Sequence, residues 1–142
     1  NNQDSVKHFT LSSFANIHNN LLNGNRANDA YTLLAGSFIE GLSLTCKIYE
    51  NGKDAKIGQL IGHQKLFLEN LMTLLSNCTD DKNITDLTTK LSQLETIYNK
   101  LEIKSSASND PNIKEITPII ISDDLIKEIS ISISEIRNSY IN

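Results

Sequence analysis

The segment of residues 28–50, NDAYTLLAGSFIEGLSLTCKIYE, constrains the fold more than any other part of the chain. On a helix with about 100° per residue, large apolar residues cover more than half of its circumference. The rest of the circumference is one narrow polar stripe, formed by Thr32, Gly36, Glu40, Ser43, Lys47 and Glu50. A surface helix has an apolar face of roughly 100°, so this segment is predicted to be a central rod with neighbours on several sides.

The same segment contains an unusual number of small residues, which are Ala35, Gly36, Ser37, Gly41 and Ser43. Each glycine inside a helix costs about 1 kcal/mol relative to alanine. Close approach of another backbone would offset that cost. We therefore expect these positions to be packing notches for a neighbouring helix.

Apolar residues at spacings of three and four predict helices on both sides of the central segment. The first covers residues 10–22 and is followed by an Asn-Gly stop. The third begins after Asp54, and the fourth begins at Asp81 or Asn83. Asn28 or Asp29 is expected to cap the central helix, and Asn51-Gly52 to end it. The fourth helix has the clearest heptad seam, formed by Ile84, Leu87, Leu91, Leu94, Tyr98 and Leu101.

The last part of the chain is ambiguous. Isoleucine and serine alternate over residues 129–134, which is a strand pattern, but the longer window of residues 122–140 keeps helical spacing after a Ser122 cap. We favour a helix, which leaves Ile131 on the outer face, where it could contact a second copy or a partner. Before it, residues 104–121 contain two prolines and predict an extended crossover whose three isoleucines, residues 119–121, dock on the bundle.

Together these patterns predict an all-α fold. It is an antiparallel bundle of about five helices with a long crossover before the last helix. Residues 1–9 are expected to be a disordered tail, and residues 10–142 a single domain. Cys46 and Cys78 each lie near the end of consecutive antiparallel helices, about 30 Å apart, so both thiols are predicted to be free, Cys46 buried and Cys78 near the surface.

Composition argues against several partners. The net charge is −4, and the 13 basic residues are spread singly, so no basic cluster exists to bind nucleic acid or an anionic membrane surface. No apolar run is long enough to cross a bilayer. The sequence begins without methionine, so we expect that any signal peptide or lipid anchor has been removed and that a membrane is contacted only through such an anchor.

Several chemistries lack the residues they need. A di-metal bundle requires Glu-x-x-His pairs, which are missing, and the three histidines lie on separate segments. Neither a Gly-x-Ser-x-Gly elbow nor a phosphate-binding loop occurs. The acidic turn at Asp81 lacks the glycine and glutamate of a calcium loop. We predict no catalytic, metal-binding or cofactor-binding residues, no cofactor and no enzymatic activity.

The remaining polar candidates are Gln64, His63, Tyr31 and Tyr49, which could line a pocket between helices. Gln64 is expected at the centre of the apolar face of the third helix, where it would tie two helices by hydrogen bonds. Phosphotransfer bundles instead use a histidine followed three residues later by lysine. In this chain Lys65 follows His63 by two residues, so the two side chains do not share a face.

Three short stretches carry a family resemblance: GSFIEGL at residues 36–42, QKLFLENL at residues 64–71, and Ile136-Arg137-Asn138. They resemble an uncharacterised family of secreted or lipid-anchored envelope proteins of Bacteroidetes, in which a small-residue helix precedes a Q-K-x-x-L-x-N-L helix. Phe38 stands where the family more often has tryptophan, and Gly41 where it often has alanine.

The resemblance implies an exported, helical, non-catalytic protein. The sequence therefore predicts an envelope-associated, periplasmic or surface module that binds a protein or small ligand of unknown identity. The alternative is a cytoplasmic sensory or phosphorelay bundle, in which His63 would be exposed with a cation beside it.

Overall fold

The computed structural model describes residues 19, 23, 26–78, 81–101 and 119–141. Within them it contains four helices and no strand: α2 (Ala27–Gly52), α3 (Ala55–Leu75), α4 (Lys82–Tyr98) and α5 (Asp123–Ile141). The predicted all-α class is confirmed. The predicted tail at residues 1–9, the predicted helix at residues 10–22 apart from Asn19, which is helical, and the predicted crossover up to residue 118 lie outside the described residues.

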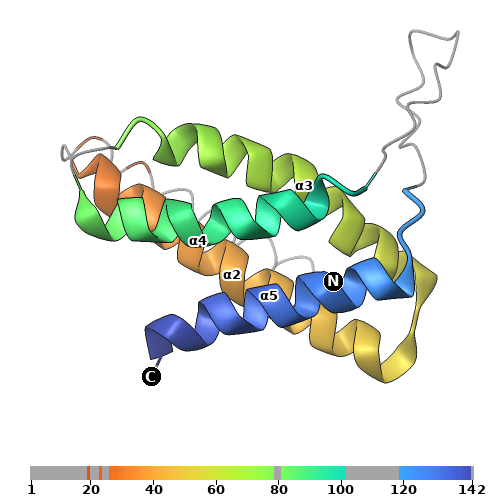
Figure 1. Ribbon diagram of the computed structural model, residues 1–142. Coiled ribbons are helices and arrows are strands. Elements are labelled where there is room, and N and C mark those ends of the chain that lie inside the picture. Colours follow the sequence, from red (N-terminus) through yellow and green to blue (C-terminus); the bar gives the residue numbers. More distant parts are fainter. Residues whose placement is uncertain (1–18, 20–22, 24–25, 79–80, 102–118, 142) are drawn as a thin grey trace, which may run out of the picture.

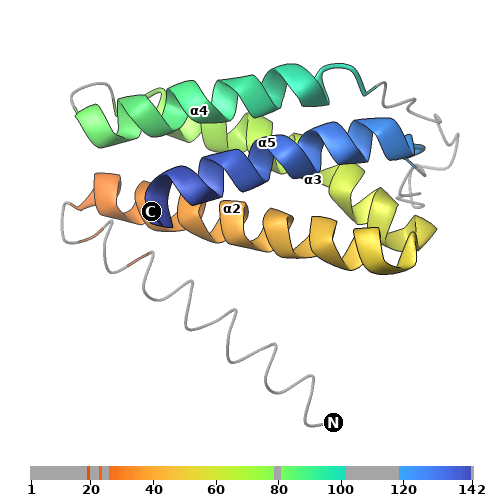
Figure 2. The same ribbon diagram turned by 60° about the horizontal axis from the view of Figure 1, so that its bottom comes forward.

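The four helices form a ring in which each packs against two neighbours (Figures 1 and 2). The neighbouring pairs are α2 with α3, α3 with α4, α4 with α5, and α5 with α2. Tyr49 near the end of α2 bonds to Asp123 at the start of α5, and Tyr140 near the end of α5 bonds to Asp86 in α4. All neighbours are therefore antiparallel, as in an up-and-down bundle.

The prediction of a central rod is wrong, because α2 is one of four equivalent members of the ring. Its inner residues Phe38 and Leu42 are buried, as expected. On its outer side, however, Leu33, Leu44 and Ile48 are 37%, 60% and 50% exposed. Four helices of similar length share one core along their common axis, so none of them is enclosed on all sides.

The polar stripe of α2 borders α5. In it, Glu50 accepts a hydrogen bond from Ser130 of α5 at 2.6 Å, Ser43 is buried, and Glu40 pairs with Arg137 of α5. The stripe therefore makes the polar part of a helix contact, while the opposite apolar residues face outward. The sequence reveals the stripe, but not which helix it faces.

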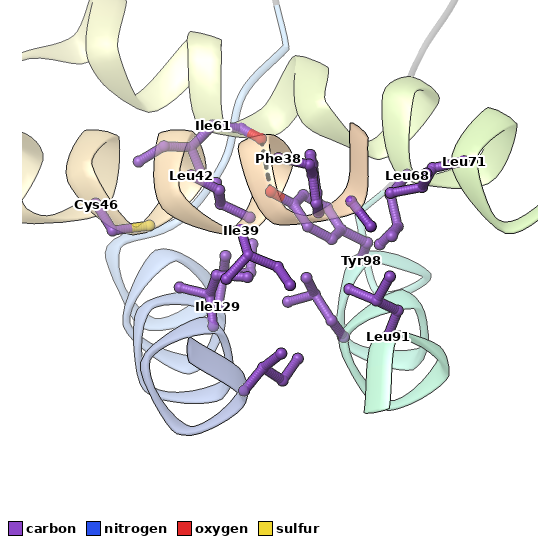
Figure 3. Close-up of a cluster of buried hydrophobic side chains, with 14 of the residues drawn as sticks. Phe38, Ile39, Leu42, Cys46, Ile61, Leu68, Leu71, Leu91, Tyr98 and Ile129 are labelled. Atoms are coloured by element: carbon purple, nitrogen blue, oxygen red, sulfur yellow. Dashed lines mark hydrogen bonds between the residues drawn. The ribbon is translucent and has the colours of Figure 1, made fainter. Parts of the chain in front are cut away.

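The core lies between the four helices and is almost entirely aliphatic (Figure 3). All six residues of the predicted seam of α4 and its continuation are at most 6% exposed, which confirms that prediction. Tyr98 brings one polar group into the core, and its hydroxyl donates a hydrogen bond to the Ile61 carbonyl oxygen at 2.9 Å. Burial raises the pKa of the Tyr98 hydroxyl well above its usual value.

The predicted packing notches are wrong for the two glycines of α2. A Cβ added at Gly36 or Gly41 would meet no atom within 4 Å. The close approaches instead occur on α3, where a Cβ at Gly62 would lie 2.7 Å from Cγ2 of Ile119, and one at Gly58 would lie 3.2 Å from the ring of Tyr49. Composition identifies small residues, but only the packing shows which of them face a neighbour.

Three predicted helix caps are confirmed. Asp54 accepts a hydrogen bond from Lys56, Asp81 from Asn83 and Ile84, and Ser122 from Leu125, each through a side-chain oxygen and a backbone N–H at the helix start. These bonds satisfy amide groups that have no partner inside the helix.

Both predicted ends of α2 are corrected. The residue before it is Arg26, whose side chain makes no capping bond, while Asn28 and Asp29 lie inside the first turn. At the other end Gly52 is helical, and Lys53 adopts the left-handed conformation with φ 50°. Its N–H donates to the Tyr49 carbonyl, and its amine lies 4.9 Å from the centre of the Tyr49 ring. These contacts offset the cost of the left-handed backbone.

The last segment is a helix, as favoured, and Ile131 is 51% exposed on it. Of the three crossover isoleucines, Ile119 is buried and Ile121 packs against the core, but Ile120 is 89% exposed. The prediction that all three dock is therefore wrong for Ile120. Ile120 faces away from the core, while the isoleucines on either side of it face the core.

Both cysteines are free, with Cys46 buried and Cys78 half-buried, as predicted. Cys46 lies in the second half of α2, and Cys78 follows the end of the antiparallel α3, which places them toward opposite ends of the hairpin. Burial, with a contribution from Glu50, raises the pKa of the Cys46 thiol to about 12.

Candidate functional site

A pocket of about 530 Å³ lies at the end of the bundle where α2 and α4 begin and α5 ends. Antiparallel packing brings these three segments together, although they are far apart in the sequence (Figure 2). The lining residues are Thr32, Gly36, Ile39, Glu40, Asn83, Asp86, Leu87, Arg137, Tyr140 and Ile141. The volume falls within the range of small-molecule sites in proteins.

The inner wall of the pocket is apolar. Ile39 of α2 and Leu87 of α4 are 5% and 6% exposed, and Ile141 is half-exposed at the edge. Gly36 keeps the adjoining space open, because it lines the pocket without a side chain and no atom lies within 4 Å of where its Cβ would be. An apolar group that entered here would leave water against a preformed hydrophobic surface.

Arg137 supplies a positive charge to this pocket. Its Nε lies 2.9 Å from Oε2 and 2.8 Å from Oε1 of Glu40, so the carboxylate fixes the side chain through one nitrogen. Among the described residues, no other hydrogen bond of the Arg137 side chain is formed. The pair is partly exposed, so it contributes little to stability. The ion pair holds the Arg137 guanidinium beside the apolar wall. The terminal N–H groups of the guanidinium remain available to donate to a ligand.

A second polar cluster orders the other side of the pocket. The Tyr140 hydroxyl donates to Oδ2 of Asp86 at 3.1 Å, and Nζ of Lys90 lies 2.7 Å from the same oxygen. Nζ also lies 4.2 Å from the centre of the Tyr140 ring. The Lys90 bond lowers the pKa of Asp86, and the same bond raises the pKa of Lys90. Both groups are therefore charged at neutral pH, and they fix the Tyr140 ring as part of the wall.

The Thr32 hydroxyl is not available to donate a hydrogen bond to a ligand. It donates to the Asn28 carbonyl of its own helix at 2.8 Å. The remaining polar groups of the lining are the carboxylates of Glu40 and Asp86, the Asn83 amide, the Arg137 guanidinium and the Tyr140 hydroxyl, which donates to Asp86. In the described part of the chain, no group of three His, Cys, Asp or Glu side chains is placed to hold a metal ion. The arrangement is suited to binding an apolar group with one hydrogen-bond acceptor.

The four residues predicted from the sequence do not form one site, and none of them lines this pocket. Tyr31 is half-buried near the start of α2, and Tyr49 is buried near its end, about 27 Å away at 1.5 Å per residue. His63 and Gln64 are half-buried in the middle of α3. Gln64 donates to the Leu60 carbonyl of its own helix at 3.4 Å, so it does not tie two helices together as expected.

Tyr49 lies instead beside a second cavity, of about 450 Å³, at the other end of the bundle. Its hydroxyl bonds to Asp123, and this bond raises the pKa of the Tyr49 hydroxyl. Lys53 and Lys127 also line this cavity, together with Asp124. Charged side chains surround it, and its lining is less apolar than that of the first pocket.

The phosphorelay alternative predicts a cation beside His63, and Lys65 is the lysine nearest to it in the sequence. The Lys65 amine donates to the Leu101 carbonyl at 3.1 Å, on the side of α3 that faces α4. The two side chains therefore point to different sides of the helix, as their spacing predicted.

Comparison with protein-family models, curated proteins and solved structures gives no significant match for this chain. Among the described residues, no helix is both long and apolar enough to cross a membrane.

The sequence holds only partial signals for the pocket. Thr32, Gly36 and Glu40 belong to the polar stripe that the sequence analysis identified, and they are its members that line the pocket. Glu40 and Arg137 also belong to two of the stretches that carry the family resemblance. They are separated by 97 residues, so no periodicity could have paired them.

Proposed function

We propose that this chain is a non-enzymatic helical binding module of the bacterial cell envelope, and that its binding site is the pocket between α2, α4 and α5. The observation that supports this proposal best is the preformed pocket with buried apolar residues at Ile39 and Leu87 and a guanidinium held at its side by Glu40. Sites for small ligands combine such a hydrophobic wall with a few fixed polar groups.

The ligand class follows from the lining. An apolar body occupies the space left by Gly36, and an anionic or carbonyl oxygen accepts hydrogen bonds from Arg137. A carboxylate such as that of a short fatty acid, or the acidic end of an apolar peptide, has this chemistry. A strongly cationic ligand is not favoured, because Glu40 and Asp86 are each already paired with a cation.

The envelope location rests on the family resemblance, which implies export and contact with the membrane through a removed lipid anchor. The predicted fifth helix at residues 10–22 and the crossover before α5 belong to the same proposed module. Oligomer formation through Ile131 is compatible with its 51% exposure. The cytoplasmic phosphorelay alternative is less favoured, because Lys65, two residues after His63, donates to the Leu101 carbonyl.

The binding proposal can be tested with two fluorescent probes. The first, 1-anilinonaphthalene-8-sulfonate, has an apolar ring system and an anionic group, while N-phenyl-1-naphthylamine has no charge. We expect both to bind the full chain with increased fluorescence. Gly36→Leu, which fills the open space, is expected to weaken both probes by about tenfold or more, because a buried apolar contact of this size contributes roughly 1.5–3 kcal/mol.

Gly36→Ala is the matched control, because it adds the same helix propensity with little bulk. It should bind both probes almost as the unchanged chain does. Arg137→Met is expected to weaken the sulfonate probe and leave the neutral probe unchanged. The proposed site is refuted if Gly36→Leu binds both probes as tightly as the unchanged chain does and unfolds at the same temperature. The probes would then bind at another place on the protein.

A further inference from the structure

The charge balance of the pocket between α2, α4 and α5 depends on a residue that does not line it. The lining residues include two carboxylates, those of Glu40 and Asp86, and one cation, Arg137. Glu40 is compensated by Arg137, whose Nε lies 2.8 Å from its Oε1. Asp86 has no such partner within the lining, so its negative charge must be compensated from outside it.

Lys90 supplies the compensating charge from the next turn of α4. Its Nζ lies 2.7 Å from Oδ2 of Asp86, as the spacing of four residues allows. The same amine lies 4.2 Å from the centre of the Tyr140 ring, so α5 also holds it in place. The Lys90 side chain is consequently only 29% exposed, against 55% for Lys100 in its ion pair with Glu128.

This ion pair affects a bound ligand more than it affects stability. A partly exposed pair between residues four apart stabilises a helix only slightly. A ligand in the pocket, however, displaces water from the apolar wall at Ile39 and Leu87. Charges act on each other more strongly where less water lies between them. An uncompensated Asp86 would therefore repel a negative group of the ligand.

We propose that Lys90 is a specificity-determining residue of this pocket, which admits an apolar ligand with one negative charge because Lys90 neutralises Asp86. The inference rests on the proposed binding site and adds the charge of its ligand. Arg137 donates hydrogen bonds to the single negative group. A second negative group is not favoured, because no other cation is present among the described lining residues.

The selectivity ratio tests this role. We define it as the affinity for 1-anilinonaphthalene-8-sulfonate divided by the affinity for the neutral N-phenyl-1-naphthylamine, both measured by fluorescence titration of the full chain. Lys90→Met removes the charge but keeps a long apolar side chain. It should lower the ratio about fivefold, because a charge several ångströms away in a partly solvated site acts with this strength. High salt should reduce the difference, because ions screen partly exposed charges.

Lys100→Met is the matched control. It removes the same charge from a comparable ion pair beyond the opposite end of α4, so it should leave the ratio unchanged. Adding Asp86→Asn to Lys90→Met should restore the ratio, because it removes the charge left unpaired. Lys90→Arg should also keep the ratio. Asp86→Asn alone leaves Lys90 unpaired and should raise the ratio, which gives a second measurement without removal of the lysine.

A lower ratio in Lys90→Met that Asp86→Asn restores supports the proposal. Equal weakening of both probes by Lys90→Met would show that the lysine only positions the Tyr140 ring, and this result overturns the proposal. An unchanged ratio in Lys90→Met and in Asp86→Asn also overturns it. Gly36→Leu separates the two proposals. If it weakens both probes while Lys90→Met behaves like Lys100→Met, the pocket stands and only the role of Lys90 is wrong. If Gly36→Leu weakens neither probe, both proposals are wrong.

Discussion

Replacement of Gly62 by alanine tests how closely α3 packs against Ile119. The added Cβ would lie 2.7 Å from Cγ2 and 3.5 Å from Cβ of Ile119, and 3.6 Å from Cδ2 of Leu101. Carbon atoms in favourable contact are roughly 3.5–4.0 Å apart, so Ile119 must move. Ile119 is β-branched and buried, and its Cγ2 is attached directly to Cβ, so a change of rotamer cannot easily clear the contact.

Two effects of opposite sign decide the result. Alanine in place of glycine inside a helix gains about 1 kcal/mol, and overpacking of a close contact costs about 1–3 kcal/mol. At Gly36 only the first effect applies, because nothing lies near the added Cβ. The free energy of unfolding of Gly62→Ala should therefore be about 1–3 kcal/mol lower than that of Gly36→Ala, which corresponds to a thermal midpoint about 3–10 °C lower.

Thermal and urea unfolding followed by circular dichroism would measure the difference. Ile119→Ala removes the methyl group that causes the clash, so Gly62→Ala should become stabilising in that background. The reasoning is refuted if Gly62→Ala is as stable as Gly36→Ala in the unchanged chain. It is also refuted if the cost of Gly62→Ala persists after Ile119 has been shortened.

Three further predictions concern single side chains. Lys53→Gly should stabilise the chain by about 0.5–1 kcal/mol, because glycine adopts the left-handed backbone without strain, whereas Lys53→Ala should not; urea unfolding measures both. The pKa of Asp86 is lowered, mainly by Lys90, so its stabilising effect is present above about pH 4 and is lost as the pH falls through the lowered value. Asp86→Asn should therefore flatten the dependence of the unfolding midpoint on pH in the acid range; an unchanged profile would contradict this. Ellman's reagent at pH 8 should modify Cys78 in the folded chain and Cys46 only after unfolding, since burial raises the Cys46 pKa to about 12; equal rates in the folded chain would contradict this.

The sequence predicted the helices well, because their signals are local. A helix start needs only a side-chain acceptor at the right position, and Asp54, Asp81 and Ser122 provide it. The seam of α4 is equally local, since residues three and four apart share a face. These features depend on neighbours in the chain and not on which helix packs where.

The arrangement of the helices was less predictable. A broad apolar face on α2 suggested neighbours on several sides, but it does not distinguish an enclosed helix from one in a ring with exposed leucines. The glycines show the same limit. Gly36 and Gly62 look alike in the sequence, yet one is open and the other lies against Ile119, because contacts between distant segments set the space at each position.

The candidate site shows why distant pairing is the hardest part to predict. Tyr31, Tyr49, His63 and Gln64 were chosen as polar residues in apolar surroundings, a criterion that also selects residues whose hydrogen bonds are satisfied locally or at a helix end. The pocket instead depends on Glu40 and Arg137, which are individually ordinary surface charges. Their position becomes informative only when antiparallel packing brings α2 and α5 together beside the empty space at Gly36. A binding site of this kind is a property of the ring and not of any single helix, and for that reason Gly36→Leu, which alters the space without altering a polar group, tests it more directly than removal of any one charge.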